Sequence, residues 1–464
     1  MPSGSGTSSG LHRELGLWQA TSLNIANMIG IGPFITIPAF ISAMNGPQAM
    51  LAWIVAAVLV IADGLAWSEL GAAFPGSGGS YHFLREIYGR YRWGRVLPFL
   101  FIWQFLISGA LEMASGYIGG LKYLYYLAPS LESWSFPGGA KWLAAASALV
   151  VTFLLFQPIR RLGLFSILLC AGSLITVAVV IITGWLHFDS SLLKFPPDAF
   201  TFDRTFSQGL GAAMLIAIYD YLGYYNVCHL GDEVKSPART IPRAVMISIV
   251  VVAAIYLTMN LAIIGVVPWE EAMKSQNIAA LFMERIYGRT AAMVLTCLIL
   301  WTCTACMFAI TLGYSRIPYA AAVRGDFFSI FAKVHPTNRY PWVSLAVLGG
   351  LTAVFCFFEL EDVITAAVGV RILVQFVGQI IGLLLIRRQL PAETFPFRMW
   401  LFPLPCFVAL AGWIFVFAMA KPLIIAASFG VIVSGALFFV VWSHFNPPEH
   451  LPPHDSPDDT KQPG

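Results

Sequence analysis

The sequence predicts an all-α polytopic membrane protein with twelve transmembrane helices. Its 464 residues are 58% hydrophobic and only 11% charged, whereas a soluble domain usually carries about 25% charged residues. Several stretches without Asp, Glu, Lys or Arg exceed the roughly 20 residues that a spanning helix needs. Because backbone amides in lipid must be satisfied within their own segment, we expect these stretches to be helices rather than strands.

The charge-free stretches place the helices along the chain. They cover 15–62, 162–188, 244–269, 290–315, 399–420 and 422–448. The first is long enough for two helices. In order, the expected spans are 15–43, 47–72, 95–127, 141–158, 162–187, 207–232, 242–267, 288–316, 341–358, 362–386, 399–420 and 422–443.

These spans are expected to form one transporter domain over residues 15–443. Two successive five-helix blocks, 15–187 and 207–386, would be repeats, and 399–443 would hold the last two helices. The Ser/Gly-rich residues 1–14 and the Pro/Asp/His-rich residues 446–464 are typical of disordered tails.

Loop charge predicts the orientation. If the N-terminus is cytoplasmic, the cytoplasmic loops hold roughly twice as many Lys and Arg residues as the outer loops. This asymmetry predicts that both tails are cytoplasmic. We expect a multi-pass protein of the cell membrane, of the bacterial inner or plasma membrane type.

Two helices carry unusual residues in their middle. The first is interrupted by Gly30, Gly32 and Pro33, and the sixth has Gly223 among several tyrosines and Asp220. Gly and Pro also make ordinary kinks in membrane helices. Breaks at matching positions of two blocks, one of them beside an intramembrane acid, instead favour an inverted-repeat transporter with its binding site at the breaks.

Helix physics predicts what the first break binds. Pro33 has no N–H and suits the start of a new half-helix. The amides of Gly30, Ile31 and Gly32 would then lie at the positive end of that half-helix and suit a carboxylate. Carbonyls at the end of the preceding half, near Asn27 to Ile29, and those near Tyr219 would suit an ammonium group. A zwitterionic α-amino acid fits both ends.

Five segments, in order, resemble signatures of the amino acid–polyamine–organocation superfamily, most closely its L-type amino acid transporter-like branch. The resemblance covers about residues 15–420. The segments are GIGPF at 30–34, EL at 69–70 with FPGSGGSY at 74–81, DEVKSP at 232–237 with IP at 241–242, the loop 315–341 with RGD at 324–326 and VHP at 334–336, and RR at 387–388 with FPFR at 395–398.

The resemblance implies a LeuT-like fold of five plus five inverted helices with two added, and alternating access around helices 1 and 6. It implies that the amides of Gly30, Ile31 and Gly32 receive the substrate carboxylate, and that the carbonyls of Ile29 and Tyr219 receive the amine. It implies a gating aromatic at Tyr219 and a side-chain pocket lined by Tyr224 and Tyr225. Gly223 and Asp220 at the same break are expected beside that pocket, although L-type members have a small neutral residue at the position of Asp220.

The sequence departs from that family pattern in three places. Ile31 stands where the family has a serine, so only its backbone can contribute. Ser173 stands where many members have a lysine that takes part in cation or proton coupling. The outer loop 122–139 has no cysteine, so no disulfide to a helper subunit is expected.

Four ionisable residues fall inside expected spans: Asp63, Glu112, Asp220 and Arg371. A charge at bilayer depth costs at least about 2.5 kcal/mol, so each needs a partner, a proton or water. One interpretation is a buried Asp220–Arg371 ion pair with neutral Glu112 and Asp63. The other is that Asp220 or Glu112 binds a second amine or carries a coupling proton, with Asp63 a further candidate.

The sequence therefore predicts a secondary amino-acid transporter, working by exchange or proton symport. The alternative is a polyamine or cationic amino-acid transporter that uses Glu112 and Asp220 as amine partners. A membrane enzyme is disfavoured because HExxH and an exposed Cys/His pair are missing. A sensor that does not transport is a further possibility. The expected partners are a small-molecule substrate and the lipid bilayer, with no cofactor, metal or nucleic acid.

Overall fold

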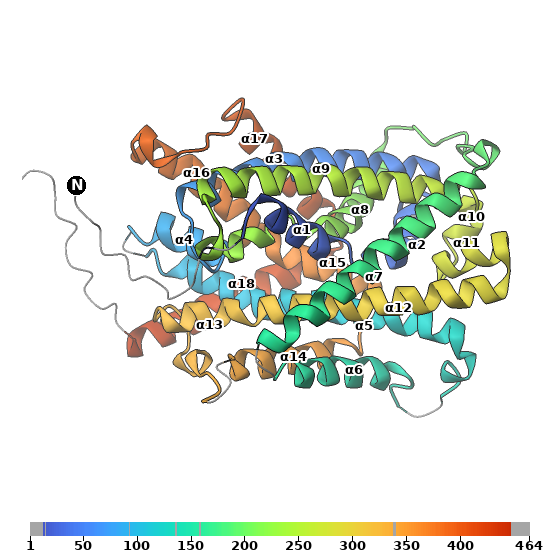
Figure 1. Ribbon diagram of the computed structural model, residues 1–464. Coiled ribbons are helices and arrows are strands. Elements are labelled where there is room, and N and C mark those ends of the chain that lie inside the picture. Colours follow the sequence, from blue (N-terminus) through green and yellow to red (C-terminus); the bar gives the residue numbers. More distant parts are fainter. Residues whose placement is uncertain are drawn as a thin grey trace, which may run out of the picture.

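The computed structural model is a bundle of helices that run roughly along one direction (Figure 1). It describes residues 13, 15–91, 93–134, 137–156, 159–336 and 340–446, without side chains for 159–170. Within these ranges there is no β-strand, only isolated bridges between Leu15 and Val234 and between Ser77 and Leu230. The all-α prediction is confirmed. Almost all of the two predicted tails, 1–14 and 446–464, lies outside the described residues.

Six described helices are long and apolar enough to cross a membrane. They are α3 (Met50–Ala73, preceded by η1, Pro47–Ala49), α5 (Val96–Leu127), α9 (Pro237–Ile264), α12 (Arg289–Tyr314) with α13 (Arg316–Val323), α15 (Leu360–Arg371) with the π-helical turn η7 (Ile372–Val377) and α16 (Gly378–Gln389), and α18 (Pro422–Phe445).

The remaining bundle helices are shorter or broken. The bent pair α1 (Leu17–Met28) and α2 (Gly32–Met44) passes the same test when taken as one span. The others are α6 (Lys141–Leu154), α7 (Ile159–Leu186), α8 (Arg204–Tyr221), α14 (Trp342–Phe355) and α17 (Leu404–Met419). The count of twelve spans stays a prediction.

Short helices cap the two ends of the bundle (Figure 1). One end holds α4 (Ser80–Tyr88) and the other holds α10 (Trp269–Ala272) and α11 (Ile278–Tyr287). The 3₁₀ turns are η2 (Pro129–Leu131), η3 (Ser190–Leu192), η4 (Asn226–His229), η5 (Gly231–Glu233), η6 (Ser329–Ala332) and η8 (Ala392–Thr394).

The first and sixth predicted helices are both interrupted. The axes of α1 and α2 differ by 52° across the residues between them. The helix expected over 207–232 ends at Tyr221, and Gly223 has a φ of +108°, a conformation that favours glycine. The chain then continues as η4 and η5. Since α2 packs along α8 and α1 along α9, the two interruptions lie together inside the bundle.

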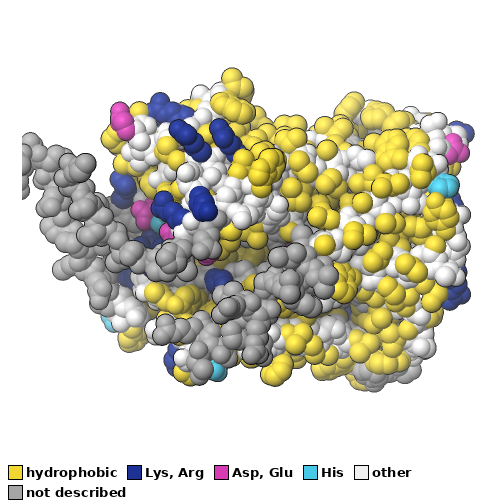
Figure 2. All heavy atoms as spheres, viewed as in Figure 1, with side chains coloured by type: hydrophobic (Ala, Val, Ile, Leu, Met, Phe, Trp, Pro, Cys, Tyr) yellow, Lys and Arg dark blue, Asp and Glu magenta, His cyan; other side chains and the backbone are white. Residues whose placement is uncertain are grey.

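The surface matches a bilayer environment. In Figure 2, hydrophobic side chains cover the middle of the visible face, and charged side chains gather towards its two ends. Large apolar side chains such as Leu437 and Val440 of α18 are exposed. Since isolated apolar residues are normal on soluble proteins but a continuous apolar belt is not, lipid is the solvent of this face. The chain is an integral multi-pass membrane protein.

Candidate functional site

The break between α1 and α2 frees backbone donors. The Gly30 amide donates to the Met28 carbonyl (2.9 Å), and the Phe34 amide donates to the Ile31 carbonyl (2.9 Å). Among the described residues, no backbone acceptor is found for the amides of Ile31 and Gly32. These two amides stand at the positive end of α2. Of the three predicted carboxylate donors, the Gly30 amide is therefore engaged with Met28, and the Ile31 amide is hydrogen-bonded to the Cys306 sulfur of α12. The Gly32 amide is the one without a backbone acceptor or such a contact among the described residues.

Both glycines of the break are in close contact with other helices. A Cβ atom on Gly30 would lie 2.5 Å from the Cys306 sulfur of α12. A Cβ atom on Gly32 would overlap Oδ1 of Asp220 on α8. Glycine is thus required at these positions because neighbouring side chains lie too close for a Cβ atom, in addition to any need for backbone freedom. The break is enclosed by α12 on one side and α8 on the other.

A small cavity lies at the break. Its volume is about 20 Å³, which is room for about one water molecule. Six predicted residues line it: Gly30, Ile31, Gly32, Glu112, Tyr219 and Asp220. Asn27 and Met28, at the expected end of the preceding half-helix, also line it. The remaining lining residues, which the sequence analysis missed, are Leu222, Cys306, Met307 and Ile310. Ile29 is buried beside the cavity but does not line it.

Asp220 points from α8 towards the start of α2. Its Oδ2 accepts a hydrogen bond from the Thr36 hydroxyl (2.6 Å), while Oδ1 has no hydrogen-bond partner. The side chain is only 3% exposed. An ion pair between Asp220 and Arg371 was one expectation from the sequence, and it is wrong. The Asp220 carboxylate faces α2, whereas Arg371 on α15 faces α5.

Glu112 is the actual partner of Arg371. The Arg371 Nη2 atom lies 2.5 Å from Glu112 Oε2, and Tyr314 donates a hydrogen bond to the same oxygen (2.8 Å). Arg371 Nε also donates to the Ser108 hydroxyl (3.0 Å). With Arg371 only 1% exposed, the pair is compensated inside the bundle. The expectation of a neutral, unpaired Glu112 is corrected accordingly.

Tyr219 reaches across the cavity to α5. Its hydroxyl lies 2.6 Å from the Ser115 hydroxyl, and its carbonyl accepts a hydrogen bond from the Leu222 amide (3.2 Å). The first contact holds the Tyr219 side chain against α5, and the second holds its backbone at the end of α8. This position, over the α1–α2 break, is compatible with the predicted gating role.

Tyr224 and Tyr225 lie away from the cavity. The Tyr224 hydroxyl donates to Asp63 on α3, which also accepts from the indole of Trp413 (3.2 Å). The Tyr225 ring stacks on Trp67, with 4.3 Å between ring centroids. Neither tyrosine lines the small cavity, and their place in the side-chain pocket stays a prediction. The left-handed turn at Gly223 directs the following residues towards α3 and α17.

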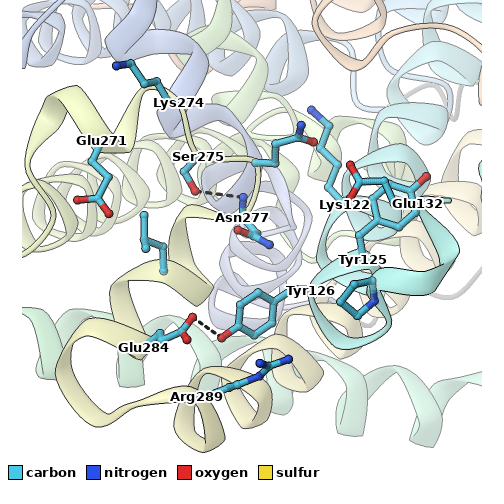
Figure 3. Close-up of a pocket in the computed structure, with 13 residues that line it drawn as sticks. Lys122, Tyr125, Tyr126, Glu132, Glu271, Lys274, Ser275, Asn277, Glu284 and Arg289 are labelled. Atoms are coloured by element: carbon cyan, nitrogen blue, oxygen red, sulfur yellow. Dashed lines mark hydrogen bonds between the residues drawn. The ribbon is translucent and has the colours of Figure 1, made fainter.

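A larger, open pocket lies at the end of the bundle that holds α10 and α11 (Figure 3). It has a volume of about 580 Å³ and is lined by the end of α5, by η2 and by the segment leading into α12. Figure 3 shows that acidic and basic side chains both face it. They are Lys122, Glu132, Glu271, Lys274, Glu284 and Arg289. Since these groups are mixed in sign, the pocket suits a polar solute without selecting one net charge.

Known amino acid transporters of several kinds are similar to this chain. Residues 15–449 match the family model described as amino acid permease. The serine/threonine exchanger SteT of Bacillus subtilis (strain 168) is 27% identical over 414 residues, which is 88% of this chain and 91% of that protein.

Two animal proteins give further matches. The Asc-type amino acid transporter 1 of Mus musculus is 26% identical over 446 residues, 92% of this chain and 81% of that protein. The cystine/glutamate transporter of Homo sapiens is 27% identical over 399 residues, 84% of this chain and 77% of that protein. The similarity therefore extends over nearly the whole chain and includes both broken helices.

Proposed function

The chain belongs to the amino acid permease family, and from this premise we propose that it carries its amino acid by alternating access around the breaks at α1–α2 and after α8. The single observation that carries the proposal is the start of α2 facing the central cavity: the Gly32 amide has no backbone acceptor among the described residues, and the Ile31 amide is held only by the Cys306 sulfur, a weak acceptor. A half-helix start of this kind binds a carboxylate without a basic side chain.

The proposed pose uses backbone groups at both ends. The carboxylate of the substrate accepts hydrogen bonds from the amides of Ile31 and Gly32. The ammonium group of the substrate donates hydrogen bonds to the carbonyls of Ile29 and Tyr219. Tyr219 closes over the bound molecule. The apolar lining of Met28, Leu222, Met307 and Ile310 favours an uncharged side chain. Because the cavity is only about 20 Å³, the bundle has to open before a substrate enters.

Exchange is supported by the similarity to a protein named a serine/threonine exchanger, and proton symport by the buried acid at the cavity. The wide mixed-charge pocket beside α10 and α11 would then be the outer approach to the site. We propose that residues 15–443 form one transporter domain. Residues 15–187 and 207–386 would be its two inverted repeats, and 399–443 would hold the last two helices.

A polyamine or cationic amino-acid carrier is the second candidate. It is favoured by the unpartnered Oδ1 of Asp220 and by 26% identity to cationic amino acid transporter 4 of Mus musculus. It is weakened by Glu112, whose carboxylate is already bound by Arg371 and Tyr314. With one of its two acids engaged, the cavity matches a polyamine less well than a zwitterion.

We further propose that both tails are cytoplasmic and that the protein resides in the cell membrane without a disulfide-linked helper subunit. Loop charge supports the orientation. The loop 122–139 has no cysteine, which supports a protein that has no helper subunit linked to this loop by a disulfide.

Uptake into proteoliposomes tests the proposed function. Labelled serine, threonine, leucine, glutamate, lysine and putrescine would be compared, each with and without unlabelled substrate inside. We expect uptake of neutral amino acids, and we expect N-acetylation or esterification of the substrate to abolish it. Uptake of putrescine in preference to every amino acid would overturn the proposal in favour of the second candidate.

A further inference from the structure

The Asp220 carboxylate lies next to the site where the substrate carboxylate is expected to bind. Its Oδ1 lies against Gly32, the first residue of α2, so closely that a Cβ atom there would overlap it. This oxygen has no hydrogen-bond partner, and the residue is 3% exposed. A buried, unpartnered acid is thus aimed at the positive end of a half-helix.

The groups that face Asp220 come from five helices. Thr36 of α2 donates to it, and Gly32 of the same helix lies against it. Its own helix α8 contributes Tyr219 and Tyr221, α9 contributes Tyr256, α12 contributes Cys306 and α5 contributes Glu112. None of the described cavity-lining residues is Lys, Arg or His.

Among the described residues, no basic side chain therefore compensates the charge of Asp220. Arg371 compensates Glu112, and the ionised form of Asp220 is stabilised only by Thr36 and by the start of α2. A substrate carboxylate on the amides of Ile31 and Gly32 would come next to that ionised carboxylate. Two carboxylates that share one dry site cannot both stay ionised.

We propose that Asp220 takes up one proton when a zwitterionic amino acid binds and releases it when the amino acid leaves, so that each substrate crosses the membrane with one proton. On the loading side, a proton from water adds to the Asp220 carboxylate, and the neutral acid moves away from the start of α2. On the other side, the substrate leaves and the acid returns its proton to water. This inference rests on the proposed function.

The other buried acids are less suited to this role. Glu112 is held by Arg371 and Tyr314, and Asp63 is held by Tyr224 and Trp413 away from the cavity. Ser173, at the position where many relatives of the resembled family have a lysine, is not ionisable. Asp220 is the acid in direct contact with the carboxylate subsite.

The test uses the full chain in proteoliposomes and a labelled neutral amino acid. The KM for uptake is measured from pH 5 to pH 8, and internal pH is followed with a trapped dye. Wild-type protein should accumulate substrate only with an inward proton gradient. Above the midpoint its KM should rise up to about tenfold per pH unit, because each bound substrate needs one proton.

The decisive variant is Asp220→Asn, which resembles the protonated acid in shape. It should keep exchange of internal for external amino acid, with a KM that no longer depends on pH, and it should lose accumulation driven by the gradient. Asp198→Asn is the matched control, since Asp198 is exposed in the loop before α8; it should behave as wild type.

Thr36→Val gives a second, independent readout. Removing the hydroxyl that donates to Asp220 disfavours the ionised form, so the pH midpoint of uptake should move up by about one unit. A wild-type KM that does not change with pH, or an Asp220→Asn variant that still accumulates substrate with the gradient, overturns the inference. Either result leaves amino acid transport intact, whereas no amino acid uptake at all overturns the proposed function itself.

Discussion

Arg371 of α15 and Glu112 of α5 form an ion pair in the interior of the bundle, with 2.5 Å between Nη2 and Oε2. Arg371 is the last residue of α15, and the π-helical turn η7 follows directly. Glu112 also lines the central cavity. The pair therefore connects the wall of the cavity to α15.

Removing one partner of this pair should destabilise the protein strongly. Arg371→Met leaves the Glu112 carboxylate buried without its cation, which costs about 3–5 kcal/mol. We expect a clear fall in the thermal unfolding midpoint in detergent. The double variant Arg371→Met/Glu112→Gln should recover most of that loss, because neither charge of the pair is left without its partner. Equal destabilisation in the single and double variants would contradict this assignment of the ion pair.

A methyl group at Gly32 should block the site. Because its Cβ would overlap Oδ1 of Asp220, Gly32→Ala forces α2 and α8 apart at a cost of about 1–3 kcal/mol. We expect uptake to fall by about tenfold or more, which corresponds to about 1.4 kcal/mol. Gly350→Ala is the control, since a Cβ at Gly350 in α14 meets nothing within 4 Å. Similar losses in both variants would mean that close packing at Gly32 is not the cause.

The hydrogen bond between Tyr219 and Ser115 should contribute to substrate closure. Tyr219→Phe and Ser115→Ala each remove it, and a bond of this kind is worth about 1 kcal/mol. We expect each variant to raise the KM about fivefold, and the double variant to raise it no further. Measured uptake kinetics of the three variants form a double-mutant cycle. Strictly additive effects would show that the two hydroxyl groups act separately.

His82, outside the membrane spans in α4, should make stability depend on pH. Burial, and then the positive charge of Arg324 beside it, lower the pKa of His82 from 6.5 to about 4. The folded state thus binds fewer protons than the unfolded state between these values. Stability should fall as pH drops from about 6.5 towards 4, by at most about 3 kcal/mol.

Thermal unfolding midpoints in detergent between pH 4 and 8 check this prediction. His82→Gln should remove part of the loss at low pH, while the exposed His444→Gln should not. The pH dependence of stability is thereby separated from the pH dependence of substrate affinity, which we assign to Asp220. An unchanged pH profile in His82→Gln would contradict the assignment.

Much of this architecture could be predicted from local sequence. Residues 30–33 predict the first break because Gly and Pro determine the backbone conformation at their own positions. The buried acids Glu112 and Asp220 stand out because charges are rare in apolar runs. Both features depend on a residue and its immediate neighbours, and the structure brings both to one cavity.

The partners of the buried charges could not be predicted in the same way. Whether Arg371 meets Asp220 or Glu112 depends on the rotation of α15, which sequence spacing leaves open. The direction of Tyr224 and Tyr225 was missed because the sixth helix ends at Tyr221 instead of continuing to 232. Cys306 and Met307 lie in a charge-free stretch and resemble ordinary core residues, so nothing marked them as cavity lining.

Protection of Cys306 by substrate tests the central claim, that the amino acid binds at the α1–α2 break, most directly. Cys306 lines the cavity against Gly30. In a variant that keeps Cys306 and replaces the other cysteines of the seven in the chain, the rate of alkylation by a small maleimide would be measured during turnover. We predict that a transported amino acid slows labelling several-fold and that its N-acetyl derivative does not. Labelling at the same rate with and without a saturating transported amino acid would contradict the account.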